Sequence, residues 1–128
     1  MTSLQILQVE DQEDIREIVA ISLGSDPGIQ LTSVGSGAEA LEILAGDLRP
    51  DVILLDVMMP EMDGLETLSR LRRLPGHAET PVIFMTARTM EHERTRYFEL
   101  GALGIIPKPF DPVSLARSVR DILAGAKS

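Results

Sequence analysis

Polar residues come at the ends of short aliphatic runs of the chain, and their types suit a metal ion and a phosphoryl group. Glu10 and Asp11 follow the first run, and Asp56 ends the run Val-Ile-Leu-Leu. Thr86 and Lys108 come at the ends of two later runs. If the runs are parallel strands, these side chains meet at one edge of a sheet, where open α/β sheets bind ligands. Carboxylates that converge there repel one another unless a cation joins them.

A hard divalent cation fits this set of oxygen ligands. Mg²⁺ is the best match because it takes few protein ligands and keeps several waters. No His or Cys stands at these positions, which argues against zinc. With a phosphoryl group in the site, Lys108 would supply a second positive charge and Thr86 a hydrogen bond. Asp56 could then act as a nucleophile and form an aspartyl phosphate, a reaction that needs mainly positioning and charge stabilisation.

Alternating strands and helices must carry these residues. Short apolar segments predict strands at residues 4–9, 29–34, 52–55, 82–85 and 103–106. Apolar residues at helical spacing predict helices at residues 14–23, 38–45, 65–71, 90–100 and 111–124. This alternation predicts an α/β fold: a single doubly wound, five-stranded parallel sheet with helices on both faces. The flavodoxin-like order 2-1-3-4-5 is the natural topology for such a sheet.

Composition limits the class of protein. The 128 residues are expected to form a single domain, residues 1–128, and the aromatic content of 3% without tryptophan predicts an aliphatic core. Cysteine is absent, so no disulfide can form. We find no signal peptide and no apolar run of membrane-spanning length, and therefore expect a cytoplasmic location without membrane insertion. The net charge of −8 argues against direct binding of nucleic acid.

Motifs at the predicted strand ends resemble a known family. Glu10-Asp11 comes first, and Asp56 lies within Leu-Leu-Asp-Val-Met-Met-Pro-Glu-Met-Asp-Gly. Thr86-Ala87 and Lys108-Pro109-Phe110 follow in order. Together they resemble the receiver domain of bacterial two-component response regulators, the CheY-like superfamily, over essentially the whole chain. The resemblance implies that Asp56 accepts a phosphoryl group from a phosphohistidine on a sensor histidine kinase or histidine phosphotransfer protein.

The same resemblance assigns the other site residues. It implies that Asp11 and Asp56 ligate Mg²⁺ directly, that Glu10 acts mainly through water, and that the backbone carbonyl of Met58 completes the protein ligands. Thr86 and Lys108 are implied to bind the phosphoryl oxygens. The peptide bond between Lys108 and Pro109 is expected to be cis, a state open to X–Pro bonds.

One position departs from the family pattern. The family usually has Tyr, Phe or His three residues before the lysine, where the ring moves inward on activation. This chain has Ile105 there. We expect the phosphorylation chemistry to survive, whereas the route of the signal to the surface is open. Tyr97 or Phe98, in the helix predicted at residues 90–100, are candidates to take part.

The resemblance predicts a signalling switch and not a classical enzyme. We expect a stand-alone receiver that signals to a downstream protein through the fourth helix, fifth strand and fifth helix, or passes phosphate along a relay. A phosphorylation-dependent dimer is a further candidate state. A binding module that keeps the fold without phosphorylation stays open because of Ile105. A phosphatase of the haloacid dehalogenase type is disfavoured because Met58 replaces the second acid of its Asp-x-Asp motif.

Other residues have structural interpretations. Asp63 is expected to cap the helix that follows it, without touching metal. An N-cap of the next helix is the alternative role of Thr86. His77 and His92 lie in polar stretches and are expected to be solvated.

Overall fold

Parallel strands form one sheet at the centre of the molecule. The computed structural model describes residues 3–127, and its strands are β1 (Leu4–Val9), β2 (Ile29–Val34), β3 (Val52–Asp56), β4 (Val82–Thr86) and β5 (Gly104–Pro107). They pair in the order β2-β1-β3-β4-β5, and every pairing is parallel. This confirms the predicted fold class and strand order.

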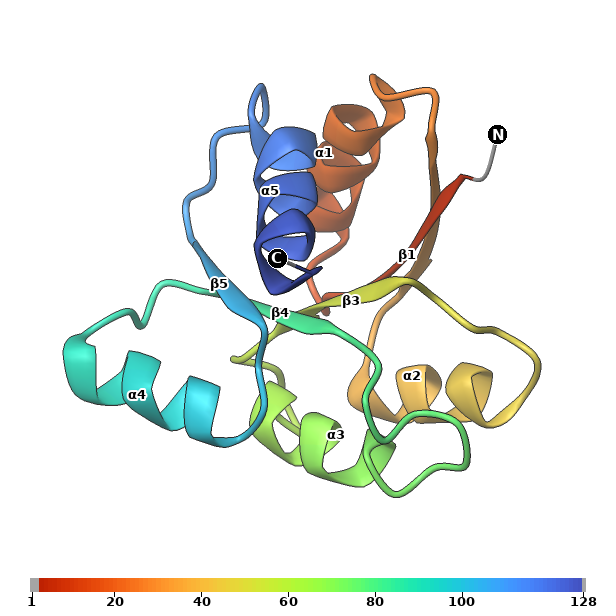
Figure 1. Cartoon of the computed structure of the whole chain (residues 1–128), viewed down its shortest axis with the longest axis vertical. Coiled ribbons are helices and arrows are strands. Elements are labelled where there is room, and N and C mark those ends of the chain that lie inside the picture. Colours follow the sequence, from red (N-terminus) through yellow and green to blue (C-terminus); the bar gives the residue numbers. More distant parts are fainter. Residues whose placement is uncertain (1–2, 128) are drawn as a thin grey trace.

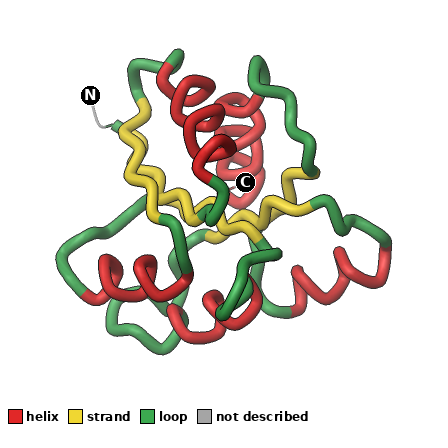
Figure 2. Tube along the Cα trace, turned by 180° about the vertical axis from the view of Figure 1, so that it is seen from behind, coloured by secondary structure: helices red, strands yellow, loops and turns green. Residues whose placement is uncertain are grey.

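Helices cover both faces of the sheet. They are α1 (Glu13–Gly24), α2 (Gly37–Ala45), α3 (Gly64–Leu71), α4 (Glu91–Glu99) and α5 (Leu115–Lys127). Figure 1 shows α1 and α5 side by side on one face and α2, α3 and α4 on the other. The view from behind shows the same two helix layers with the sheet between them (Figure 2).

Two apolar clusters hold these layers together. Side chains alternate between the two faces along a strand. In β3, Ile53 and Leu55 join the cluster under α2, α3 and α4, whereas Val52 and Leu54 join the cluster under α1 and α5. Every residue of β3 and of β4 is buried, as expected for central strands of a parallel sheet. The ends of these strands are therefore fixed from both faces.

The helix starts agree only in part with the sequence analysis. The side chain of Asp63 accepts a hydrogen bond from the Glu66 N–H at 2.8 Å, which confirms it as the N-cap of α3. The alternative role of Thr86 is wrong, because Met90 holds the N-cap position of α4 and its N–H donates to Glu93. Thr86 itself ends β4.

The last helix begins later than predicted. Residues 111–114 form a turn in which the Asp111 side chain accepts the Val113 N–H and the Asp111 carbonyl accepts the Ser114 N–H. The helix α5 then starts at Leu115 and continues to Lys127, three residues past the predicted end. The turn delays the helix because the Asp111 side chain satisfies a backbone N–H locally.

His77 is buried, so the expectation of a solvated histidine is wrong for this residue. Its side chain has 0% exposure. Its Nε2 lies 2.9 Å from the Leu44 carbonyl oxygen, and its Nδ1 lies 2.9 Å from the Thr80 hydroxyl. Since a carbonyl can only accept, Nε2 donates the hydrogen bond to the Leu44 oxygen. His77 therefore links the end of α2 to the segment before β4, whereas His92 is exposed as expected.

Replacing His77 by alanine is expected to lower the free energy of unfolding by about 3 kcal/mol, because it removes buried volume and leaves the Leu44 carbonyl without its donor. Urea unfolding followed by circular dichroism measures the change. The matched control is His92→Ala on exposed α4, for which we expect a change within about 0.5 kcal/mol. Equal stability of the two variants would contradict this role of His77.

Candidate functional site

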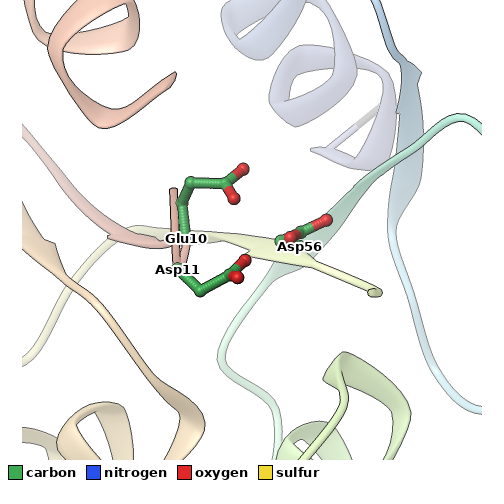
Figure 3. Close-up of side chains that lie close together, drawn as sticks. All are labelled: Glu10, Asp11 and Asp56. Carbon is green, nitrogen blue, oxygen red and sulfur yellow. The ribbon is translucent and has the colours of Figure 1, made fainter. Parts of the chain in front are cut away.

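Three carboxylates meet at the carboxyl edge of the sheet. Glu10 and Asp11 directly follow β1, and Asp56 is the last residue of β3. The two strands are neighbours, with Val9 opposite Leu55, so Glu10 continues beside Asp56. Each residue offers an oxygen, and these oxygens lie within 4.8 Å of one another. Figure 3 shows the three side chains close together at the ends of their strands, with Glu10 and Asp11 leaving the end of β1 in opposite directions.

A lysine directly after β5 partly neutralises this cluster. The Lys108 Nζ lies 2.6 Å from a Glu10 oxygen and 3.1 Å from a Asp56 oxygen. Glu10 and Asp56 are only 2% and 4% exposed, so the charges interact with little screening from water. The ammonium therefore holds together two carboxylates that would otherwise repel each other.

Burial and charge change the titration of this pair. The pKa of Glu10 is raised from its ordinary 4.5 to about 7. Burial is the largest cause, and the charge of Asp56 acts in the same direction, whereas the hydrogen bond from Lys108 lowers this pKa. Burial alone would lower the pKa of Lys108, but the hydrogen bond to Glu10 and the charges of both carboxylates outweigh it and raise this pKa. Lys108 is therefore a cation at neutral pH, where Glu10 changes its charge.

Glu10→Gln is expected to stabilise the protein at alkaline pH in the presence of a chelator. Since the pKa of Glu10 is raised on folding, its contribution to the free energy of unfolding is complete below pH 4.5 and is lost as the pH rises through about 7. A neutral amide avoids this loss, so the free energy of unfolding of the variant should exceed that of the wild type by about 2 kcal/mol near pH 8. The gain should vanish near pH 4.5.

Urea unfolding at both pH values measures this difference. Glu17→Gln is the matched control, because Glu17 is an exposed glutamate of α1 and its replacement should bring no pH-dependent gain. A Glu10→Gln variant that is less stable than the wild type near pH 8 would show that the bond to Lys108 outweighs burial.

Thr86 and Lys108 lie at neighbouring strand ends. Thr86 is 1% exposed at the end of β4, and its carbonyl accepts the Lys108 N–H at 2.9 Å. Its hydroxyl oxygen accepts the Arg88 N–H, also at 2.9 Å. The peptide bond between Lys108 and Pro109 is cis, as expected. Met58 lies two residues beyond β3 with a 57% exposed side chain, and the ligand role of its carbonyl stays a prediction.

A glycine brings α3 close to the end of β3. Gly64 is the first residue of α3, and its N–H donates to the Val57 carbonyl at 2.8 Å. A Cβ at this position would lie 2.9 Å from the Val57 Cα and closer still to the Asp56 carbonyl oxygen. Only glycine permits this approach, which fixes the backbone on which Asp56 stands. This role of Gly64 was not predicted from the sequence.

The cluster fits a magnesium ion. Its donors are carboxylate oxygens from two neighbouring strands, and Mg²⁺ prefers such ligands when few of them come from the protein. Three carboxylates beside a single lysine also leave excess negative charge that a divalent cation can neutralise. Glu10, Asp11 and Asp56 are therefore the residues of this cluster suited to hold the metal.

A sequence profile decides the family. The profile of the response regulator receiver domain matches residues 6–120. The chain belongs to the response regulator receiver domain family. Receiver domains are signalling switches and not classical enzymes. They accept a phosphoryl group and typically bind Mg²⁺ at an acidic cluster. None of the helices between residues 3 and 127 has the length and apolar character that crossing a membrane requires.

Relatives of this receiver domain include longer proteins. Response regulator MprA of Mycobacterium leprae is 38% identical over 124 residues, which are 97% of this chain and 53% of MprA. MprA of Mycobacterium ulcerans is 38% identical over 125 residues, 98% of this chain and 52% of that protein. The chain thus spans about half the length of the curated relatives it matches.

Solved structures of receiver domains share the fold. The chemotaxis response regulator CheY4 of Vibrio cholerae superposes with a TM-score of 0.85 at 32% identity, covering 94% of this chain and 99% of CheY4. The signal receiver domain of a signal transduction histidine kinase from Syntrophus aciditrophicus gives 0.81 at 37% identity, covering 98% and 93% of the two chains.

Proposed function

We propose that this receiver domain accepts a phosphoryl group on Asp56 from a phosphohistidine of a sensor histidine kinase or histidine phosphotransfer protein, with Mg²⁺ as its cofactor. The carrying observation is the contact of the Lys108 ammonium with both Asp56 and Glu10 at the edge of the sheet. This contact places a cation beside the one carboxylate that ends the central strand.

The chemistry is a displacement at phosphorus. A carboxylate oxygen of Asp56 attacks the phosphorus atom, the bond from phosphorus to the donor nitrogen breaks, and its electron pair returns to the imidazole. Lys108 and the Thr86 hydroxyl donate hydrogen bonds to the phosphoryl oxygens, where charge develops. Bound Mg²⁺ would neutralise part of the phosphoryl charge. We assign its direct ligands to Asp11, Asp56 and the Met58 carbonyl, and a ligand role through water to Glu10.

Phosphorylation is read, in this proposal, at the surface formed by α4, β5 and α5. The partner there is a downstream protein, a second phosphorylated copy of the chain or the next member of a phosphorelay. The acidic net charge of −8 supports a protein partner over direct binding of nucleic acid. We place the reaction in the cytoplasm, where phosphohistidine donors of two-component systems act.

A second candidate is a binding module of the same fold that is never phosphorylated. The observation that favours it is Ile105, which replaces the usual aromatic residue of β5. One experiment separates the two candidates. The protein is incubated with acetyl phosphate, with Mg²⁺ or with a chelator, and analysed by intact mass spectrometry and peptide mapping.

We expect one phosphoryl group per chain, only with Mg²⁺, and located on the peptide that contains Asp56. No uptake in either condition would leave the binding module as the better interpretation. Uptake on another residue would refute the assignment of Asp56.

A further inference from the structure

Arg88 is held by hydrogen bonds on both sides of its α-carbon. Its N–H donates to the Thr86 hydroxyl oxygen at 2.9 Å, and its carbonyl accepts from the Tyr97 hydroxyl at 3.0 Å. These two bonds form a continuous chain from the end of β4 to the second turn of α4, which we call the Thr86–Arg88–Tyr97 chain. At one end of the Thr86–Arg88–Tyr97 chain, Thr86 is a proposed phosphate ligand, and at the other end Tyr97 is part of the core.

Tyr97 is well placed to respond to small movements of the Arg88 backbone. Its side chain is 3% exposed, and its ring packs against Phe84 of β4 with ring centres 5.2 Å apart. The ring is therefore held by packing while its hydroxyl reaches the loop. One turn earlier on α4, Glu93 accepts the Met90 N–H at 3.2 Å and lies 3.7 Å from the Arg88 guanidinium. The loop between β4 and α4 is thus attached to α4 at two levels.

The position of this ring bears on the absent aromatic residue of β5. Phe84 pairs in register with Ile105, so both side chains lie on the same face of the sheet. Tyr97 and Phe84 are buried members of the cluster on that face, and Ile105 packs against it. The aromatic hydroxyl next to the loop therefore comes from α4, an element whose surface is part of the proposed output face.

We propose that Tyr97 is a positioning residue for Thr86 and reports phosphorylation to α4 through Arg88. This inference rests on the proposed phosphorylation of Asp56. When the Thr86 hydroxyl turns to donate its proton to a phosphoryl oxygen, its oxygen moves relative to the Arg88 N–H. Arg88 then rotates, its carbonyl moves away from the Tyr97 hydroxyl, and α4 shifts against the loop. The same contacts orient Thr86 for the reaction before phosphate arrives.

The composition of the chain makes this movement directly observable. Tyr97 is the single tyrosine and there is no tryptophan, so the intrinsic fluorescence of the protein reports on this side chain. Tyrosine emission depends on the hydrogen bond of its hydroxyl. We would phosphorylate the protein with acetyl phosphate and Mg²⁺, and measure emission and phosphorylated mass in the same samples.

We expect the emission of the wild type to change in proportion to the phosphorylated fraction. In Thr86→Ala the Thr86–Arg88–Tyr97 chain of hydrogen bonds is broken, so emission per phosphorylated molecule should stay at the unphosphorylated value. Thr86→Ser should restore the change in emission. The matched control is the double variant Tyr97→Phe with Phe98→Tyr, which moves the fluorophore to a neighbouring position that is 45% exposed in the wild type. Its emission should not respond.

Tyr97→Phe supplies the test of positioning. It keeps the ring against Phe84 and removes only the hydroxyl, so we expect phosphoryl uptake to slow by about fivefold, the effect of one neutral hydrogen bond. A Phe98→Leu variant should take up phosphate at the rate of the wild type.

The outcomes separate this inference from the proposed function. Phosphoryl uptake on Asp56 without a change in Tyr97 emission, or with a change that persists in Thr86→Ala, would overturn the inference and leave the proposed function intact. A wild type that takes up no phosphoryl group would overturn both.

Discussion

Asp56→Asn is expected to take up no phosphoryl group from acetyl phosphate, while keeping the fold. The amide nitrogen and oxygen of asparagine are far weaker nucleophiles than a carboxylate, so the covalent step cannot proceed. The amide oxygen can still accept a hydrogen bond from Lys108, which lies 3.1 Å from Asp56 in the structure. Removing one charge from a crowded acidic cluster also relieves repulsion, so stability without metal should equal or exceed that of the wild type.

Intact mass after incubation with acetyl phosphate and Mg²⁺ measures the loss, and urea unfolding checks the fold. Asp51→Asn is the matched control, since Asp51 precedes the same strand at its opposite end. Its side chain accepts the Gln5 N–H, a role that the asparagine oxygen can keep. Normal uptake by the Asp56 variant would refute Asp56 as the acceptor, and loss of uptake in both variants would indicate a defect of the strand.

Gly64→Ala is expected to destabilise the fold and to impair phosphorylation together. The added Cβ would lie 2.9 Å from the Val57 Cα and 3.0 Å from the Asp56 carbonyl carbon. These neighbours are backbone atoms of the segment that carries the acceptor, so no flexible side chain can yield. We expect a loss of about 3 kcal/mol in the free energy of unfolding. Because α3 must move away from the end of β3, uptake on Asp56 should also slow.

Gly24→Ala is the control for the general effect of replacing a helical glycine. A Cβ at Gly24, the last residue of α1, would meet no atom within 4 Å. Alanine there should raise the free energy of unfolding by up to about 1 kcal/mol and leave uptake unchanged. If the Gly64 variant matches the wild type in stability and uptake, the close approach of α3 does not constrain the site.

Most of the architecture could be predicted because the chain alternates short aliphatic runs with helical patterns. β3 and β4 are buried throughout, so their residues form uninterrupted apolar runs that end on a carboxylate and on a hydroxyl. In a parallel sheet the carboxyl ends share one edge, and this rule alone brings Glu10, Asp11 and Asp56 together. The site residues were therefore readable as a set, although their proposed roles await the experiments above.

Other features depend on partners that are distant in sequence. His77 lies in the polar stretch Pro-Gly-His-Ala-Glu-Thr, and the Leu44 carbonyl that binds it stands 33 residues away. The contact of Lys108 with Glu10 spans 98 residues, so no local pattern of the sequence indicates it. The start of α5 was misplaced because Asp111-Pro112 has the pattern of a helix start, whereas the Asp111 side chain stabilises a turn.

Pro107 limits how another chain can add to the β5 edge of the sheet. β5 is an edge strand, and Pro107 is its last residue. The next residue, Lys108, directs its N–H toward β4, so the imide nitrogen of Pro107 faces the open side of the sheet. It has no hydrogen to offer to an incoming strand. Extension of the sheet by another chain is therefore blocked at this end of the β5 edge.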